Sequence, residues 1–173
     1  MKQKLTNLAV GELVAVVVFW INFFLFKKLI ITTKSLISIS FSLFILSFIL
    51  IQGSIFWCIL IKRISKQGFA AKYTGKIYNK LKILDVILLC IGVPVIILNY
   101  STFFTMIVSF AIWIFAVIEW VNYYKLQLSY SLNPVVLLKY ILQRKLRKSK
   151  IANEIDNSFD FETYGETLEK AKF

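Results

Sequence analysis

The chain has 173 residues, of which 58% are apolar and 16% aromatic, and it carries a formal net charge of +12 at a mean hydropathy of +0.73. A water-soluble domain of this length could not bury so much apolar surface, so the composition predicts an all-α integral membrane protein. The sequence has no His and only two Cys, both inside apolar runs, which excludes a disulfide framework or a His/Cys metal site and leaves no cofactor to expect.

The first two predicted spans cover residues 8–26 and 36–61. The first run is too long for a secretory signal, lacks a small-residue cleavage pattern and ends at Lys27-Lys28, so we interpret it as a retained transmembrane helix. The second run contains Gln52-Gly53-Ser54, where the small side chains form a backbone notch that could admit a neighbouring helix.

The long connection at residues 62–82 has a helical pattern of its own. An apolar and a cationic stripe recur at every fourth residue: Phe69, Tyr73, Ile77 and Leu81, and Lys72, Lys76 and Lys80. One interpretation is a helix on an anionic membrane surface, with the three lysines as lipid contacts. The other is a helical extension of the neighbouring spans, with the lysines in water.

The third and fourth predicted spans cover residues 81–98 and 102–121. Gly92 and Pro94 should bend the third span, and the polar turn 99–101 makes the two spans a helical hairpin. The fourth begins with 17 uncharged residues, 102–118, which cover about 25 Å as a helix. The sequence thus predicts a four-helix bundle over residues 1–132.

Two further segments follow the predicted bundle. The Asn133-Pro134 pair is typical of a helix start, and residues 133–152 are predicted to form a basic amphipathic helix at the membrane surface. Its predicted lipid contacts are Lys139, Arg144, Lys145, Arg147 and Lys148. Residues 153–173 form an acidic tail, which either folds back on the basic helix or stays in solvent.

The distribution of Lys and Arg predicts the orientation in the membrane. The N-terminus carries two, the 62–82 connection seven and residues 125–150 seven, whereas the first connection carries three and the last none. Both termini are therefore expected in the cytoplasm, with anionic lipid headgroups as partners. No basic soluble domain with interleaved aromatics is present, so nucleic acid is not an expected partner.

Three acids lie within or beside the apolar runs: Glu12, Asp85 and Glu119. In the predicted topology all three lie near the cytoplasmic leaflet, which suggests a polar intramembrane cluster with Asn122 and Tyr123. The alternative is that these acids lie at the membrane interface and pair with nearby lysines. The sequence favours that alternative for Asp85 and Glu119 and a buried role for Glu12, so replacing Glu12 by Gln should impair the protein more than replacing Asp85 by Asn.

The stretch from Glu119 to Tyr130, which runs into the Arg/Lys-rich segment, resembles the C-terminal part of small, uncharacterised bacterial membrane proteins with several spans. That resemblance implies an inner-membrane architecture and no activity. Glu12 in the first span is also similar in position to the glutamate of four-helix small multidrug exporters. Those proteins are shorter and lack the 62–82 connection and the basic end.

Catalysis has little support in the sequence, because the absence of His removes most pairings of a nucleophile with a base. The leading hypothesis is a non-enzymatic membrane protein that acts through protein or lipid partners. Its protein partner would be a second copy of the chain or another membrane protein. The alternative is a small oligomeric transporter coupled to ions or protons, using the intramembrane carboxylates.

Overall fold

The computed structural model describes residues 2–29, 32–64, 71–125 and 148–156. Its helices are α1 (Lys2–Phe26), the short 3-10 turn η1 (Lys27–Leu29), α2 (Thr33–Ile64), α3 (Ala71–Leu98) and α4 (Phe103–Tyr124). Each of the four α-helices contains a stretch long and apolar enough to cross a membrane. For the described residues, the prediction of a helical chain with four long apolar helices is confirmed.

The chain divides into two compact units. Unit 1 comprises residues 1–68 and 84–120, and unit 2 comprises residues 69–83 and 121–173. Consequently α1 and α2 belong to unit 1, whereas α3 and α4 each contribute residues to both units.

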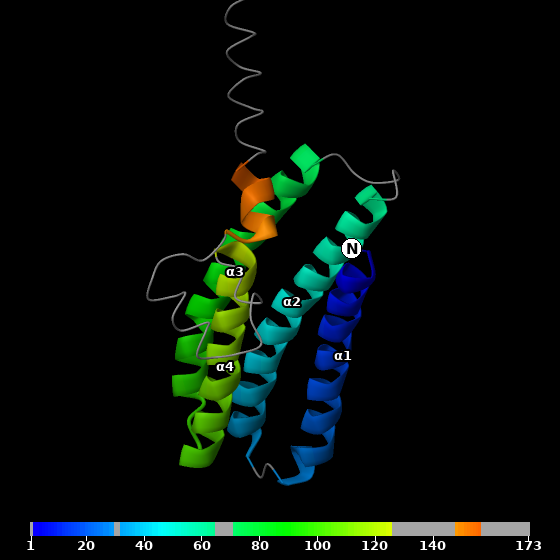
Figure 1. Cartoon of the computed structure of the whole chain (residues 1–173). Helices are drawn as coiled ribbons and strands as arrows, with labels where there is room; N and C mark the ends of the chain where they lie inside the picture. Colours follow the sequence, from blue (N-terminus) through cyan, green and yellow to red (C-terminus); the bar gives the residue numbers. More distant parts are fainter. Residues whose placement is uncertain (1, 30–31, 65–70, 126–147, 157–173) are drawn as a thin grey trace, which may run out of the picture. The chain divides into compact units, whose positions relative to one another are not determined.

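Within unit 1, α2 is the central helix (Figure 1). In its most apolar window 56% of the residues are buried, compared with 6% in α1 and 11% in α4. Side chains of α2 form hydrogen bonds with residues of α1, α3 and α4. Two bonds pair Ser35 with Thr105 and Ser38 with Ser109, so α2 and α4 run in the same direction.

At the notch predicted at Gln52-Gly53-Ser54, α2 does contact a neighbouring helix, α1. Gly53 and Ser54 are buried, and Ser54 Oγ donates a 3.0 Å hydrogen bond to the backbone oxygen of Ala9. Ala9 is itself only 3% exposed. The small residues of α2 therefore let the backbone of α1 approach closely.

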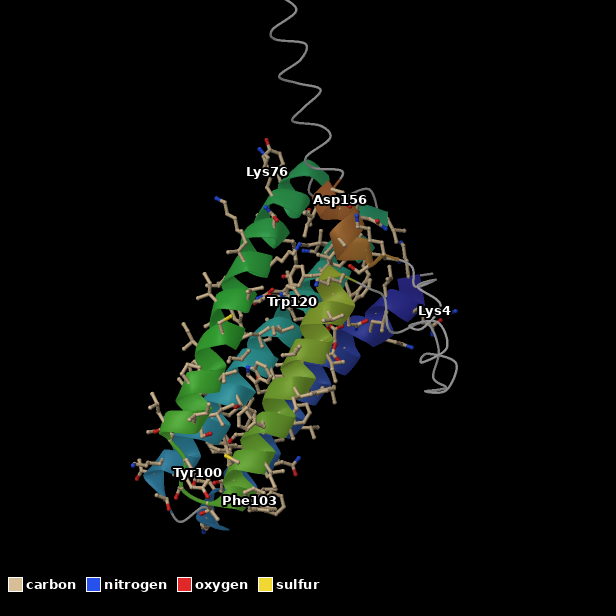
Figure 2. All side chains as sticks on the ribbon, turned by 90° about the vertical axis from the view of Figure 1, so that its left-hand side faces the viewer. Lys4, Lys76, Tyr100, Phe103, Trp120 and Asp156 are labelled. Atoms are coloured by element: carbon tan, nitrogen blue, oxygen red, sulfur yellow. The ribbon has the colours of Figure 1, made fainter. Side chains whose placement is uncertain are left out.

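In unit 1, α3 and α4 pack through a glycine and a tryptophan. A Cβ atom on Gly92 would lie 2.8 Å from both Cδ1 and Nε1 of Trp113. Trp113 Nε1 donates a 3.0 Å hydrogen bond to the backbone oxygen of Leu89 on α3. The predicted turn follows Leu98, and Figure 2 shows Tyr100 and Phe103 at this end of unit 1, with Lys4 and Trp120 towards the other.

The described residues of the 62–82 connection continue the neighbouring helices. α2 extends to Ile64 and α3 begins at Ala71, which matches the second of the two interpretations of this segment. On α3, two residues of the predicted apolar stripe lie on the exposed face. Tyr73 and Ile77 are exposed, whereas Thr74 and Tyr78 are 3% exposed. Phe69 lies outside the described residues.

In unit 2, residues 150–156 form a short helical stretch, and Ser149 immediately precedes it. Its Oγ accepts a 3.0 Å hydrogen bond from the backbone nitrogen of Ala152, the position that an N-cap serine satisfies. The same Oγ donates to the backbone oxygen of Tyr123 at the end of α4. The predicted boundary between the basic helix and the acidic tail, between residues 152 and 153, falls inside this helical stretch. Lys148, on the basic side of that boundary, forms an ion pair with Asp156 on the acidic side.

Candidate functional site

A row of buried polar side chains follows α2 along most of its length. Its members are Ser35, Ser38, Ser42, Ser47, Gln52 and Ser54. Five of the six form hydrogen bonds with another helix, and Ser42 donates to the backbone oxygen of Ser38 within α2. In an apolar surrounding, such bonds stabilise helix pairing because an unmade bond would leave a polar group in hydrocarbon.

The most deeply buried acid in the row's surroundings is Asp85 of α3, which is 0% exposed. Gln52 Nε2 donates a 2.8 Å hydrogen bond to Asp85 Oδ1. Gln52 is 5% exposed, so both partners lie inside unit 1. Asp85 is thus fully buried and receives a hydrogen bond from a neutral amide on α2, and its pairing with nearby lysines stays a prediction.

Glu12 of α1 is bound to α2 through an indole. Trp57 Nε1 donates a 2.8 Å hydrogen bond to Glu12 Oε1. Glu12 is partly exposed, so it is less buried than Asp85, the reverse of the sequence expectation. Since Gln52 and Trp57 are five residues apart on α2, their backbone positions are separated by about 7.5 Å along the helix axis. The two acids therefore meet the same end of α2.

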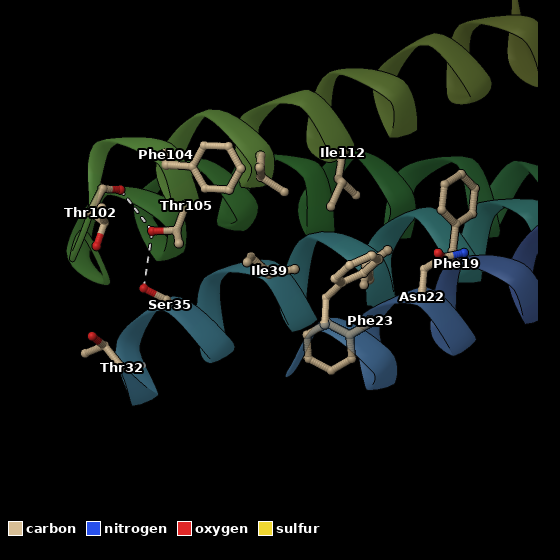
Figure 3. Close-up of a pocket in the computed structure, with 13 residues that line it drawn as sticks. Phe19, Asn22, Phe23, Thr32, Ser35, Ile39, Thr102, Phe104, Thr105 and Ile112 are labelled. Atoms are coloured by element: carbon tan, nitrogen blue, oxygen red, sulfur yellow. Dashed lines mark hydrogen bonds between the residues drawn. The ribbon is translucent and has the colours of Figure 1, made fainter. Parts of the chain in front are cut away.

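At the opposite end of unit 1, α2 and α4 are joined by hydroxyl groups. Ser38 Oγ donates a 2.8 Å hydrogen bond to Ser109 Oγ, and Ser109 Oγ donates to the backbone oxygen of Thr105. Ser35 Oγ lies 3.2 Å from Thr105 Oγ1, as Figure 3 shows. These hydroxyl contacts are not among the sites predicted from the sequence. Their signal was the spacing of Ser35, Ser38 and Ser42 by three and four residues within an apolar run.

An apolar layer separates the hydroxyl groups from the acids. Ile45, Leu46 and Ile49 of α2 are 0%, 1% and 0% exposed. Ser42 and Gln52, which flank the layer, are ten residues apart, or about 15 Å along the helix. Ser47 lies between them, where it accepts a 2.9 Å hydrogen bond from Trp20 Nε1 of α1. Its hydroxyl is thus engaged with α1.

The five residues of the predicted polar cluster are distributed over both units. Glu12, Asp85 and Glu119 belong to unit 1, and Asn122 and Tyr123 belong to unit 2. The structure places Glu12 and Asp85 against α2 and leaves Glu119 partly exposed on α4. A single pocket shared by all five stays a prediction.

The predicted lipid contacts are described only in part. Lys76 and Lys80 are exposed on α3, and Lys148 is exposed and paired with Asp156. The side chain of Lys72 and the residues Lys139, Arg144, Lys145 and Arg147 lie outside the described part of the structure. Contact of these side chains with lipid also stays a prediction.

Among the described residues, no group of three or more His, Cys, Asp or Glu side chains could hold a metal ion, and Cys58 and Cys90 are free thiols. Comparison of the chain with family models, curated proteins and solved structures found no match.

Proposed function

We propose that the chain is a non-enzymatic multi-pass protein of the bacterial cytoplasmic membrane that acts through lipid or protein partners. The observation that carries this proposal is the use of the buried polar groups. Asp85 and Glu12 receive hydrogen bonds from Gln52 and Trp57, two neutral donors fixed on the central helix α2. Groups arranged in this way hold helices together.

In the proposed arrangement the four helices form a bundle with both termini in the cytoplasm. Lys76 and Lys80 would then lie on the cytoplasmic side, where exposed cations attract anionic headgroups. The basic segment 133–152 would add an amphipathic helix at the same surface, followed by the acidic tail. A second copy of the chain or another membrane protein would pack against the exposed apolar faces of α1 and α4.

A small oligomeric transporter coupled to ions or protons is the second candidate. The observation in its favour is the complete burial of Asp85 within a candidate membrane span, a position where carboxyl groups commonly serve transport. The buried layer of Ile45, Leu46 and Ile49 argues against a continuous polar path along α2. The non-enzymatic, partner-based function is therefore the better supported of the two.

A flux measurement in proteoliposomes separates the two functions. The parent chain and the Asp85→Asn variant are reconstituted with a pH-sensitive dye inside, and a proton gradient or a potassium diffusion potential is applied. The proposed function predicts dye responses equal to those of protein-free liposomes for both proteins. A flux that the parent supports and Asp85→Asn abolishes would establish the transporter instead.

A further inference from the structure

A cavity of about 730 Å³ lies between α1, α2 and α4 within unit 1. Its lining is mainly apolar and comes from all three helices, with Phe23 on α1, Ile39 and Leu43 on α2, and Val108 and Ile112 on α4. The volume is within the range of about 300–1,000 Å³ that is usual for small-molecule sites. It is only partly enclosed, so a ligand could enter from the side of the helices.

Hydroxyl groups gather at one end of the cavity, and Asn22, which lines the other end, donates a 2.8 Å hydrogen bond to the backbone oxygen of Val18. Thr32, Ser35, Thr102 and Thr105 line the hydroxyl end, and Figure 3 shows these four residues gathered at one end, with Phe19 and Ile112 further along. Ser35 Oγ and Thr105 Oγ1 are 3.2 Å apart, and Thr105 Oγ1 donates to the backbone oxygen of Thr102. Hydroxyl groups at this end can turn to donate to an oxyanion.

Three lysines adjoin the hydroxyl end in the sequence. Lys27 and Lys28 follow Phe26, which lines the cavity, and Lys34 precedes Ser35. All three side chains are exposed. They are also the only Lys or Arg residues of the first connection, the side that the overall charge distribution assigns to the exterior. Positive charge here opposes the topological bias, and an anionic ligand at the same place would account for it.

The shape and polarity of the cavity fit a lipid chain. At about 730 Å³, the cavity has room for one long acyl chain. The acyl chain gains little free energy by moving from the bilayer into the cavity, because lipid tails are as apolar as the cavity lining. Selectivity must therefore come from the headgroup.

We propose that this cavity binds an anionic glycerophospholipid, with one acyl chain between α1, α2 and α4 and its phosphate at the hydroxyl and lysine end. The proposal depends on the proposed membrane location and names one lipid partner. Because the lysines lie in the first connection, the lipid would come from the leaflet opposite to that of the cytoplasmic cationic surface. Each lysine near a membrane surface is worth about fivefold in affinity for anionic lipid.

The test uses the full chain in phosphatidylcholine liposomes containing a trace of phosphatidylglycerol with a diazirine in its acyl chain. After illumination, mass spectrometry maps the labelled residues. We expect labelling concentrated at Phe23, Ile39 and Val108, and competition by excess phosphatidylglycerol but not by added phosphatidylcholine. The triple variant Lys27→Gln/Lys28→Gln/Lys34→Gln should lose at least about tenfold of this labelling.

The matched control removes the same charge from the other ends of the same helices, as Lys2→Gln/Lys4→Gln/Lys62→Gln, and should leave cavity labelling within about twofold. A second variant, Val108→Trp, narrows the cavity without changing charge and should also reduce cavity labelling. Equal cavity labelling by a phosphatidylcholine probe, or equal losses in both triple variants, would overturn the lipid site. No labelling of the exposed face of α1, at Val14 and Val18, by the phosphatidylcholine probe would instead contradict the membrane location itself.

Discussion

Gln52 on α2 and Asp85 on α3 are joined by a 2.8 Å hydrogen bond between side chains that are 5% and 0% exposed. Among the described residues, Asp85 is the only fully buried acid. Its hydrogen-bond donor belongs to α2, the most buried of the four helices. Removing either partner leaves the other polar group in an apolar surrounding, which is costly.

A double-mutant cycle measures this coupling. We expect Asp85→Ala to destabilise unit 1 by about 1–3 kcal/mol, because it leaves the Gln52 amide without this acceptor. The coupling between Gln52→Ala and Asp85→Ala should be about 0.6 kcal/mol, the mean for hydrogen bonds between membrane helices, and at most about 1.7 kcal/mol. Unfolding in mixed detergent micelles provides the free energies. Strictly additive effects of the two substitutions would show that the bond contributes nothing.

Neutral substitutions of the two bound acids should follow their burial. Asp85→Asn is expected to lower the unfolding midpoint more than Glu12→Gln, because Asp85 is fully buried and Glu12 is partly exposed. This order reverses the one expected from the sequence. The measurement is thermal unfolding in detergent by circular dichroism. A larger loss for Glu12→Gln would restore the sequence expectation.

Close packing of α3 on α4 predicts a strong effect of a single methyl group. In Gly92→Ala the new Cβ would lie 2.8 Å from Trp113 and 3.1 Å from Cδ1 of Ile45, so we expect a loss of about 1–3 kcal/mol from overpacking. Gly11→Ala is the matched control, since nothing lies within 4 Å of the position that its new methyl group would take. It should be neutral or stabilising by up to about 1 kcal/mol. Equal effects at both glycines would contradict the packing described.

The cap in unit 2 gives a prediction about the helical stretch 150–156. Ser149→Ala removes the acceptor for the Ala152 amide and should weaken the 150–156 helix by about 0.5–2 kcal/mol. Hydrogen exchange of the amides at 152–156 should then accelerate. Ser149→Asp keeps a capping acceptor but cannot donate to Tyr123, so it separates the two roles of the hydroxyl. Unchanged exchange in Ser149→Ala would exclude the cap.

Reporter fusions test the orientation. The basic residues in the 62–82 connection and in residues 125–150 predict that a reporter placed at Gln67 or after Lys150 lies in the cytoplasm. A reporter at Asn99, in the turn between α3 and α4, should be active outside. The opposite pattern at all three positions would invert the topology.

Much of the helical pattern could be predicted because apolar run lengths and polar turns are local signals. The notch at Gly53 and Ser54 and the turn after Leu98 are examples, since small or polar residues there stand out from their neighbours. The extent of α2 was harder to predict: it reaches Ile64, because Lys62 and Arg63 are good helix formers that continue a span beyond its apolar part.

The partners of the polar residues could not be predicted, because they depend on how the helices rotate against each other. Asp85 was assigned to the interface from its closeness to Lys82 in the sequence, yet it lies on the α3 face that turns inward to Gln52. The stripe of Tyr73 and Ile77 lies on the exposed side of α3, and Thr74 and Tyr78 are the buried residues there. Periodicity identifies a face without saying what covers it.

The central claim is that a chain embedded in a membrane packs its apolar helices around α2. It is tested most directly by spin labels on single cysteines at Val14, Val18, Ile45 and Ile49, in a background with Cys58 and Cys90 replaced by Ala. In liposomes, oxygen should collide freely with labels on the exposed face of α1 and little with labels on α2, and a water-soluble nickel complex should reach none of them. Nickel access at Val14 and Val18, or oxygen access at Ile45 and Ile49 equal to that on α1, would contradict the account.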